Sequence, residues 1–195
     1  MTAFTTRQQE IINATIKLIH EGGIQRLTMK NLSKRLGISE PALYRHFENK
    51  MAILLAMLQQ FKERSGNHLA RARALEGSSL EQLGTIFLEH SGQFATNPHM
   101  AAVVFSEEAF QDDSRLSELV FSVMDRAHKT ISEIIGEGQM QGTIRSDLRQ
   151  DHGALLILGS LRLMVRRWRL SNYAFDLKQE SQQVWQSLST LLRNP

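Results

Sequence analysis

Apolar side chains recur every three or four residues along most of the chain, with polar residues between them. This spacing places them on one face of a helix, whereas a strand would alternate them every second residue, and no such alternation persists. Helix-ending glycines and helix-capping serines, threonines and asparagines separate the periodic stretches. The pattern predicts an all-α protein, with helices over residues 7–21, 29–36, 40–47, 50–65, 79–95, 98–110, 114–141, 150–170 and 176–193.

The segment from residue 27 to residue 58 carries the most specific pattern. A short helix capped by Thr28 ends at Gly37, and a second short helix begins after Ser39 with Pro41 in its first turn. Proline is tolerated there because the first helical amides make no intrahelical bond. Two short helices joined by a glycine turn form a helix-turn-helix, with Ile38 expected to fill the angle between them.

The second helix of this motif is expected to lie in the major groove of DNA. Arg45 has the planar donors that bind O6 and N7 of guanine, and Ala42 and Pro41 are suited to a thymine methyl group. Tyr44 and His46 offer donors to phosphate oxygens, which fix the register of the protein on DNA. Together with Glu40, these residues form the outward side of the helix, which we call the reading face. It comprises Glu40, Pro41, Ala42, Tyr44, Arg45 and His46.

Further contacts to the DNA backbone are expected around the reading face. The amide ends of the helices capped by Thr28, Ser39 and Asn49 are anion sites, and Lys30 and Lys50 add positive charge beside them. Residues 1–64 hold ten basic and five acidic residues, although the whole chain has a net charge of only +3. This asymmetry favours a polyanionic partner for the first third of the chain.

The motif resembles the DNA-binding region of the TetR family of bacterial transcription regulators. The resemblance rests on Thr28-x3-Leu32-x3-Leu36-Gly37-Ile38-Ser39-x3-Leu43-Tyr44-x-His46-Phe47-x2-Lys50 and covers about residues 7–60. It implies a three-helix DNA-binding domain over residues 1–65, joined by a long helix to a ligand-binding and dimerisation domain over residues 66–195. Glu40 departs from the basic or small residue that is common in the family, which leaves its role open.

The resemblance also implies a homodimer that binds an inverted-repeat operator on double-stranded DNA. The sequence adds support, because residues 150–170 are apolar nearly all round and such a helix must be covered on two sides. The last helix has a narrower apolar seam, so the two closing helices are expected to form the dimer interface. The alternative is that both helices close the core of a monomer.

A small-molecule ligand that changes DNA affinity is likewise implied by the family, and a repressor is the expected form of regulator. The candidate ligand-contacting residues are aromatic or methionine side chains, which serve equally well as plain core. They are Phe87, Phe105, Phe121, Met124 and Trp168. A run of arginines is open to two interpretations, an anion site or the solvated edge of the dimer helix: Arg162, Arg166, Arg167 and Arg169.

Other kinds of chemistry are disfavoured. The chain has no cysteine, hence no thiolate metal site, and among its histidines only His128 has an acidic residue one turn away, Asp125. We therefore expect no metal, no cofactor and surface positions for the histidines. Enzyme motifs such as a phosphate-binding loop, a dinucleotide fingerprint or a nucleophile elbow are missing. Without a signal peptide or membrane-length apolar run, a cytoplasmic protein is expected.

Two alternatives to a ligand-responsive regulator remain. One is a relative that binds many chromosomal sites without a ligand, and the other is a helical enzyme or scaffold whose first helices only imitate the motif. A ligand-dependent drop in DNA affinity separates the first alternative from the main hypothesis.

Overall fold

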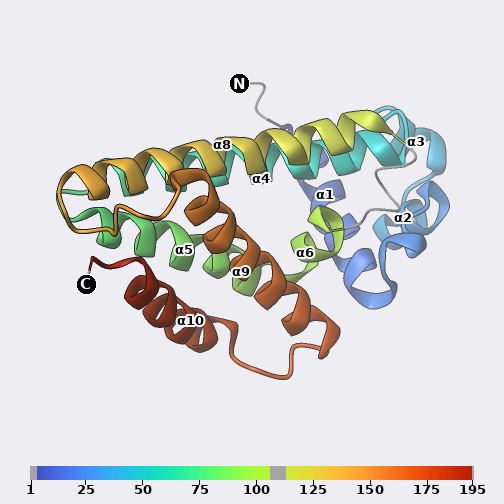
Figure 1. The fold of residues 1–195 in the computed structure, drawn as a ribbon. Helices are drawn as coiled ribbons and strands as arrows, with labels where there is room; N and C mark the ends of the chain where they lie inside the picture. Colours follow the sequence, from blue (N-terminus) through green and yellow to red (C-terminus); the bar gives the residue numbers. More distant parts are fainter. Residues whose placement is uncertain (1–3, 106–112, 195) are drawn as a thin grey trace. The chain divides into compact units, whose positions relative to one another are not determined.

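The structure is a computed structural model that describes residues 4–105 and 113–194. These residues form helices and no strand beyond one isolated bridge between Ile144 and Arg193. The all-α fold expected from the sequence is therefore confirmed. The helices in chain order are α1 (Thr6–Gly22), the 3-10 helix η1 (Ile24–Arg26), α2 (Met29–Leu36), α3 (Glu40–Tyr44), α4 (Lys50–Arg73), α5 (Ser79–Thr96), α6 (Pro98–Val104), α8 (Ser114–Met140), α9 (Gln150–Leu170) and α10 (Leu177–Leu192) (Figure 1).

The chain forms two compact units, each with its own set of contacts. The first holds residues 1–62 and 98–120, and the second holds residues 63–97 and 121–195. The long helices α4 and α8 each contribute one end to each unit. The expected division at residues 65 and 66, into a part that binds DNA and a part that binds ligand and dimerises, is a statement about function and stays a prediction.

The first unit is built on α1, whose beginning is fixed locally. The Thr5 hydroxyl accepts the Gln8 amide proton and the Gln8 side chain returns a bond to the Thr5 amide, a capping box. The inner face of α1 supplies Ile11, Ile12 and Ile19, all nearly free of solvent contact. Helices α2 and α6 both pack on α1, and the His20 and His99 rings meet there with centroids 4.4 Å apart.

Three hydrophobic residues of this region are less buried than their positions in the sequence pattern indicate. Ile38, expected to fill the angle of the turn, is only half-buried, and so are Ile16 and Leu36 on the apolar faces of α1 and α2. Leu32 and Leu43 are fully buried and Phe47 is nearly so. The core of this region is therefore narrower than expected and centred on Leu32 and Leu43.

The second unit packs α5, α9 and α10 together, and Figure 1 shows α10 lying alongside α5. The Phe87 ring of α5 lies 5.8 Å from the Trp185 ring of α10. Gly84 faces the same indole so closely that a Cβ there would lie 2.6 Å from Trp185 Nε1. A glycine is thus required for this approach of α10 to α5. Helices α4 and α8 are joined by two Arg73–Glu137 hydrogen bonds of 2.6 and 2.7 Å.

Most predicted helix boundaries agree with the structure, and α8 ends at Met140 and α10 begins at Leu177, each one residue from the expected position. Two were wrong: the helix expected over residues 50–65 continues through Gly66 to Arg73, and the helix expected over residues 40–47 ends at Tyr44. Of the helix expected over residues 98–110, α6 covers Pro98–Val104, and residues 106–112 lie outside the described part of the chain. Within the described ranges, no helix has the length and hydrophobicity needed to cross a membrane.

The burial of Leu43 generates a stability prediction. Replacing Leu43 by alanine removes a side chain with no solvent exposure and should lower the free energy of unfolding by about 2–5 kcal/mol. Chemical denaturation of the purified protein measures the change. Leu75, which is 45% exposed, is the control, and Leu75→Ala should change stability by less than about 0.5 kcal/mol. Equal effects of the two substitutions would contradict the assigned role of Leu43.

Candidate nucleic-acid interface

The turn between α2 and α3 is fixed by backbone hydrogen bonds and one glycine. Gly37 adopts the left-handed conformation with φ of 65°, and its amide bonds the carbonyl of Lys34 at 3.3 Å. The amide of Ile38 bonds the carbonyl of Ser33 at 3.1 Å. Glycine enters this conformation without the penalty that a Cβ brings, so the sequence folds here into a sharp turn. The glycine turn expected from the sequence is confirmed.

Each helix start around the turn carries the cap that the sequence predicted. The Thr28 hydroxyl accepts the Asn31 amide proton at 3.0 Å, and the Ser39 hydroxyl accepts that of Ala42 at 3.3 Å. The Asn49 side chain accepts the Ala52 amide proton at 3.0 Å at the beginning of α4. The remaining amides at these helix ends keep their positive partial charge, which favours phosphate.

The reading face lies on the side of α3 opposite its buried residues. Pro41, Tyr44 and Arg45 are exposed, Tyr44 by 48%, whereas Glu40, Ala42 and His46 are half-buried. Leu43 points the other way, into the core. The structure thus brings all six predicted residues together on one short helix and its end. Which of them contact DNA stays a prediction.

The end of α3 is tied to α1 and to the chain that follows. The Gln8 side chain donates a hydrogen bond of 3.5 Å to the carbonyl of His46, and the amides of His46 and Phe47 both bond the carbonyl of Leu43. Phe47 is 7% exposed. The backbone beneath Tyr44 and Arg45 is therefore fixed from both sides, as readout of base edges requires.

One basic residue of this region, Arg35, has an acidic partner within the fold. Arg35 forms two hydrogen bonds to Glu21, of 2.7 and 2.5 Å, which fasten α2 to α1. This contact lowers the pKa of Glu21 and raises that of Arg35, so the Arg35 charge is already used within the fold. Lys30, Lys50 and Arg45 are exposed. Electrostatic attraction to DNA therefore depends less on Arg35 than its charge alone indicates.

Glu40, the departure from the family pattern, occupies the first turn of α3 directly after its Ser39 cap. An acidic residue at this place interacts favourably with the amide dipoles of a helix start. This gives Glu40 a role within the fold besides any contact with a base. The sequence pattern left this open, and the structure adds a reason for an acid at this position.

The predicted ligand-contacting residues do not share one environment. Phe87 and Trp168 are buried, Phe105 is half-buried, and Phe121 and Met124 are exposed by 67% and 41%. The Trp168 indole donates a 2.9 Å bond to the carbonyl of Phe175, and an Arg162 N–H approaches the Met124 sulfur at 3.8 Å. A role in ligand binding for these five residues stays a prediction.

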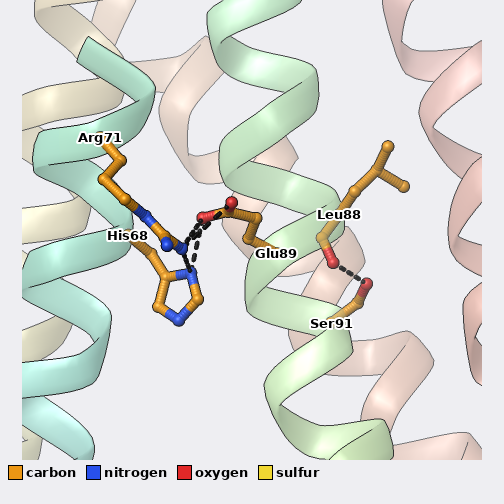
Figure 2. Close-up of polar contacts among 5 residues, drawn as sticks. All are labelled: His68, Arg71, Leu88, Glu89 and Ser91. Atoms are coloured by element: carbon orange, nitrogen blue, oxygen red, sulfur yellow. Dashed lines mark hydrogen bonds and ion pairs between the residues drawn. The ribbon is translucent and has the colours of Figure 1, made fainter. Parts of the chain in front are cut away.

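Histidines are distributed differently from the sequence interpretation, which placed them on the surface. His90 is buried, with 6% exposure, so that interpretation is wrong for His90. A position on the apolar face of α5, four residues after Ile86 and four before Phe94, is the signal that identifies it. His68 lies beside it on α4 and bonds Glu89 at 2.5 Å, with Arg71 reaching the same carboxylate (Figure 2).

The one pairing that the sequence singled out for a metal has other partners. Asp125 pairs with Lys129 at 2.8 Å, and the His128 ring contacts the carbonyl of Asp151 at 3.1 Å. Within the ranges that the structure describes, no three histidine or acidic side chains gather as a metal site would need.

Comparison with known families decides the assignment. A family model described as bacterial regulatory proteins, tetR family, matches residues 11–57, which include the whole helix-turn-helix. A second, described as YsiA-like protein, C-terminal region, matches residues 48–190. The chain belongs to the TetR family. It is a DNA-binding transcription regulator and not an enzyme.

Full-length TetR-family relatives support the same assignment. The fatty acid metabolism regulator protein of Bacillus subtilis is 24% identical over 191 residues, 96% of either chain. The nucleoid occlusion factor SlmA of Vibrio campbellii is 22% identical over 190 residues, 97% of either chain. The crystal structure of the regulator FadR from Bacillus subtilis in complex with stearoyl-CoA shares the fold, with a TM-score of 0.76 at 22% identity, over 95% of this chain and 99% of that one.

The exposed guanidinium of Arg45 generates a prediction about specificity. If Arg45 binds a guanine, Arg45→Ala should weaken binding to the preferred duplex by about 1–3 kcal/mol and relax the preference at one base pair. Binding titrations on the preferred duplex and on its single-base variants measure both effects. Arg64, an exposed arginine of α4, is the matched control and should be neutral when replaced by alanine. An equal loss on preferred and random DNA would make Arg45 a phosphate contact instead.

Proposed function

We propose that this chain is a homodimeric repressor that binds an inverted-repeat operator through α3 and leaves it when a fatty acyl-CoA binds the second unit. The observation that carries the proposal is the reading face, where exposed Tyr44 and Arg45 are backed by buried Leu43 and Phe47. Such a face is both accessible and fixed in position. Its DNA contacts are expected from the reading-face residues and from Thr28, Lys30, Ser39 and Lys50. A role on the chromosome places the protein in the cytoplasm.

An exposed apolar stripe supports dimerisation through the last two helices. Leu156, Leu163 and Leu170 of α9 are 56%, 61% and 75% exposed, and they repeat every seven residues. Leu155 and, on α10, Leu191 are exposed as well. Leucines at this spacing form the seam between packed helices, and a patch of this kind on a single chain marks an interface. A second copy of the chain is the occupant that the family favours, because dimerisation is typical of it.

The ligand class follows from relatives and is a proposal for this chain. One relative is named a fatty acid metabolism regulator, and a structural neighbour was solved with stearoyl-CoA. A ligand that binds better to the protein off DNA than to the protein on DNA lowers DNA affinity by the ratio of its two affinities. The second unit, with its apolar core of α5, α9 and α10, is suited to an acyl chain.

A second candidate function is supported by another relative. SlmA is named a nucleoid occlusion factor and matches the chain over nearly its full length. A protein of that kind would occupy many sites on the chromosome, and DNA binding would not depend on acyl-CoA. Both functions use the same reading face, so only the response to a ligand separates them.

Selection of duplexes from random DNA tests the proposed function. The purified protein should enrich an inverted repeat, and stearoyl-CoA should weaken binding to that repeat at least tenfold in a titration at fixed salt. Coenzyme A without an acyl chain is the control ligand and should leave binding unchanged. Enrichment without any effect of stearoyl-CoA would favour the ligand-independent candidate. No enrichment, with binding lost at moderate salt, would contradict sequence-specific recognition altogether.

The leucine stripe generates a separate prediction about assembly. Leu163→Glu places a charge in the proposed interface and should convert the dimer to a monomer at micromolar concentration, as measured by sedimentation velocity. DNA affinity should fall with it, because a monomer contacts one half-site. Met140→Glu is the control, since Met140 is 84% exposed at the end of α8. A Leu163→Glu protein that stays dimeric would place the interface elsewhere.

A further inference from the structure

The interior of the second unit contains polar side-chain atoms that have no partner within the described residues. They are Ser65 Oγ of α4, and His90 Nδ1 and both amide atoms of Gln93 of α5. Ser65 is 1% exposed and His90 is 6% exposed. Buried polar atoms of folded proteins are nearly always hydrogen-bonded, because an unmade bond there costs free energy. We call Ser65, His90 and Gln93 the polar cluster.

Because α4 is paired with α5, the three residues of the polar cluster lie at about the same height along the two helices. The two helices run antiparallel, since Gln82 bonds the carbonyl of Arg73 at 3.5 Å and Glu89 bonds His68 at 2.5 Å. One turn farther along this register, Ser65 is level with Gln93. His90 lies one turn before Gln93 on α5, on the side that carries Ile86 and Phe94 into the core. The register of the two helices therefore places the three residues of the polar cluster at neighbouring heights in the unit.

An ion-paired group of side chains lies near His90 of the polar cluster. The Glu89 carboxylate receives bonds from His68 and from Arg71, and Figure 2 shows these side chains meeting between the two helices. Glu89 is thereby occupied by its own partners. His90 itself is neutral at physiological pH, because burial lowers its pKa to about 4, helped by the neighbouring His68. The polar cluster thus offers hydrogen bonds without a net charge.

We propose that the polar cluster binds the thioester end of a fatty acyl-CoA. The inference rests on the proposed function and adds the recognition of the polar group that follows the acyl chain. The Ser65 hydroxyl and the Gln93 amide nitrogen donate to the thioester carbonyl oxygen. The Gln93 oxygen accepts the amide N–H that lies two carbons beyond the sulfur in coenzyme A. His90 Nδ1 completes the set as donor or acceptor, according to its tautomer.

The chemistry of the polar cluster predicts a higher affinity for an acyl thioester than for a free fatty acid. A thioester is uncharged, so its carbonyl needs donors but no counter-ion. A carboxylate buried at the same place would need a cation, and neutral His90 supplies none while the nearby guanidinium of Arg71 is already paired with Glu89. Stearoyl-CoA should therefore bind and stearate should bind at least tenfold more weakly.

Near-isosteric substitutions in the full-length protein test this inference. Gln93→Met keeps the length of the side chain and removes both amide atoms, and Ser65→Ala removes the hydroxyl. Ser65→Ala should weaken stearoyl-CoA binding about tenfold, the value of one hydrogen bond, and Gln93→Met, which loses two, should weaken it about a hundredfold. Each should also raise the melting temperature without ligand, by about 2–4 °C for Gln93→Met, because an unpartnered buried group is lost. Operator affinity should not change, which shows that the variants fold.

A matched serine serves as control. Ser181 of α10 is as buried as Ser65, but its hydroxyl donates to the carbonyl of Leu177. Ser181→Ala should leave stearoyl-CoA affinity unchanged and should not raise the melting temperature. Equal affinity of wild type and Gln93→Met for stearoyl-CoA would overturn the inference and leave the proposed function standing. A lower melting temperature of Gln93→Met without ligand would overturn it too, since the amide would then have a partner within the fold.

A different result would show that stearoyl-CoA is not a ligand of this protein. If the wild-type protein binds its operator but stearoyl-CoA neither binds nor changes operator affinity, the proposed ligand fails and the inference with it, while the role in DNA binding stands. Calorimetric titration with stearoyl-CoA and with stearate, run beside the operator titration, distinguishes these results.

Discussion

The contact with DNA depends on the burial of one leucine. Helix α3 has five residues, and a helix of that length has no stability of its own in water because the cost of its first turn is never recovered. It exists because Leu43 lies in the core with no solvent exposure and because Ser39 and the turn at Gly37 fix its start. Because the Leu43 side chain points into the core, helical geometry directs Tyr44 and Arg45 to the outer side. The exposed side chains that we propose to contact DNA are therefore placed by an unexposed one.

The two units use polar side chains in opposite ways. On α3, Tyr44 and Arg45 are exposed, so water satisfies their polar atoms and their presence costs the fold little. On α5, His90 and Gln93 are held in an apolar surround, where an unmade hydrogen bond lowers stability. A protein under selection for stability alone would replace such residues with apolar ones, so their presence favours a binding role. Their position next to the Glu89 ion pairs keeps charge close by but already neutralised.

Local signals explain what could be predicted from the sequence. Thr28, Ser39 and Asn49 act within three residues of their own position, and Gly37 within one turn, so the helix-turn-helix could be predicted in detail. Burial depends on which helix covers which, which explains why Ile16 and Leu36 are more exposed than their periodicity indicated. Ser65 and Gln93 lie at the same height only because of how α4 is aligned along α5, and no local sequence pattern encodes that alignment. The burial of His90 was missed, although the place of this histidine on the apolar face of α5 was visible in the sequence.

Chain continuity supplies a physical link between ligand and DNA. Helix α4 begins beside the Asn49 cap and Lys50, in the unit that carries the reading face, and continues to Ser65 and His68, in the unit that carries the polar cluster. A continuous helix of 24 residues transmits an axial shift or rotation because its backbone hydrogen bonds resist local deformation. A ligand that draws Ser65 toward Gln93 therefore acts on the same element whose first turn is expected to contact phosphate. The effect of such a ligand on DNA binding is limited by the difference between its affinities for the DNA-bound and the free protein and not by its total affinity, so a thioester that the polar cluster binds in only one of these states would be an effective regulator.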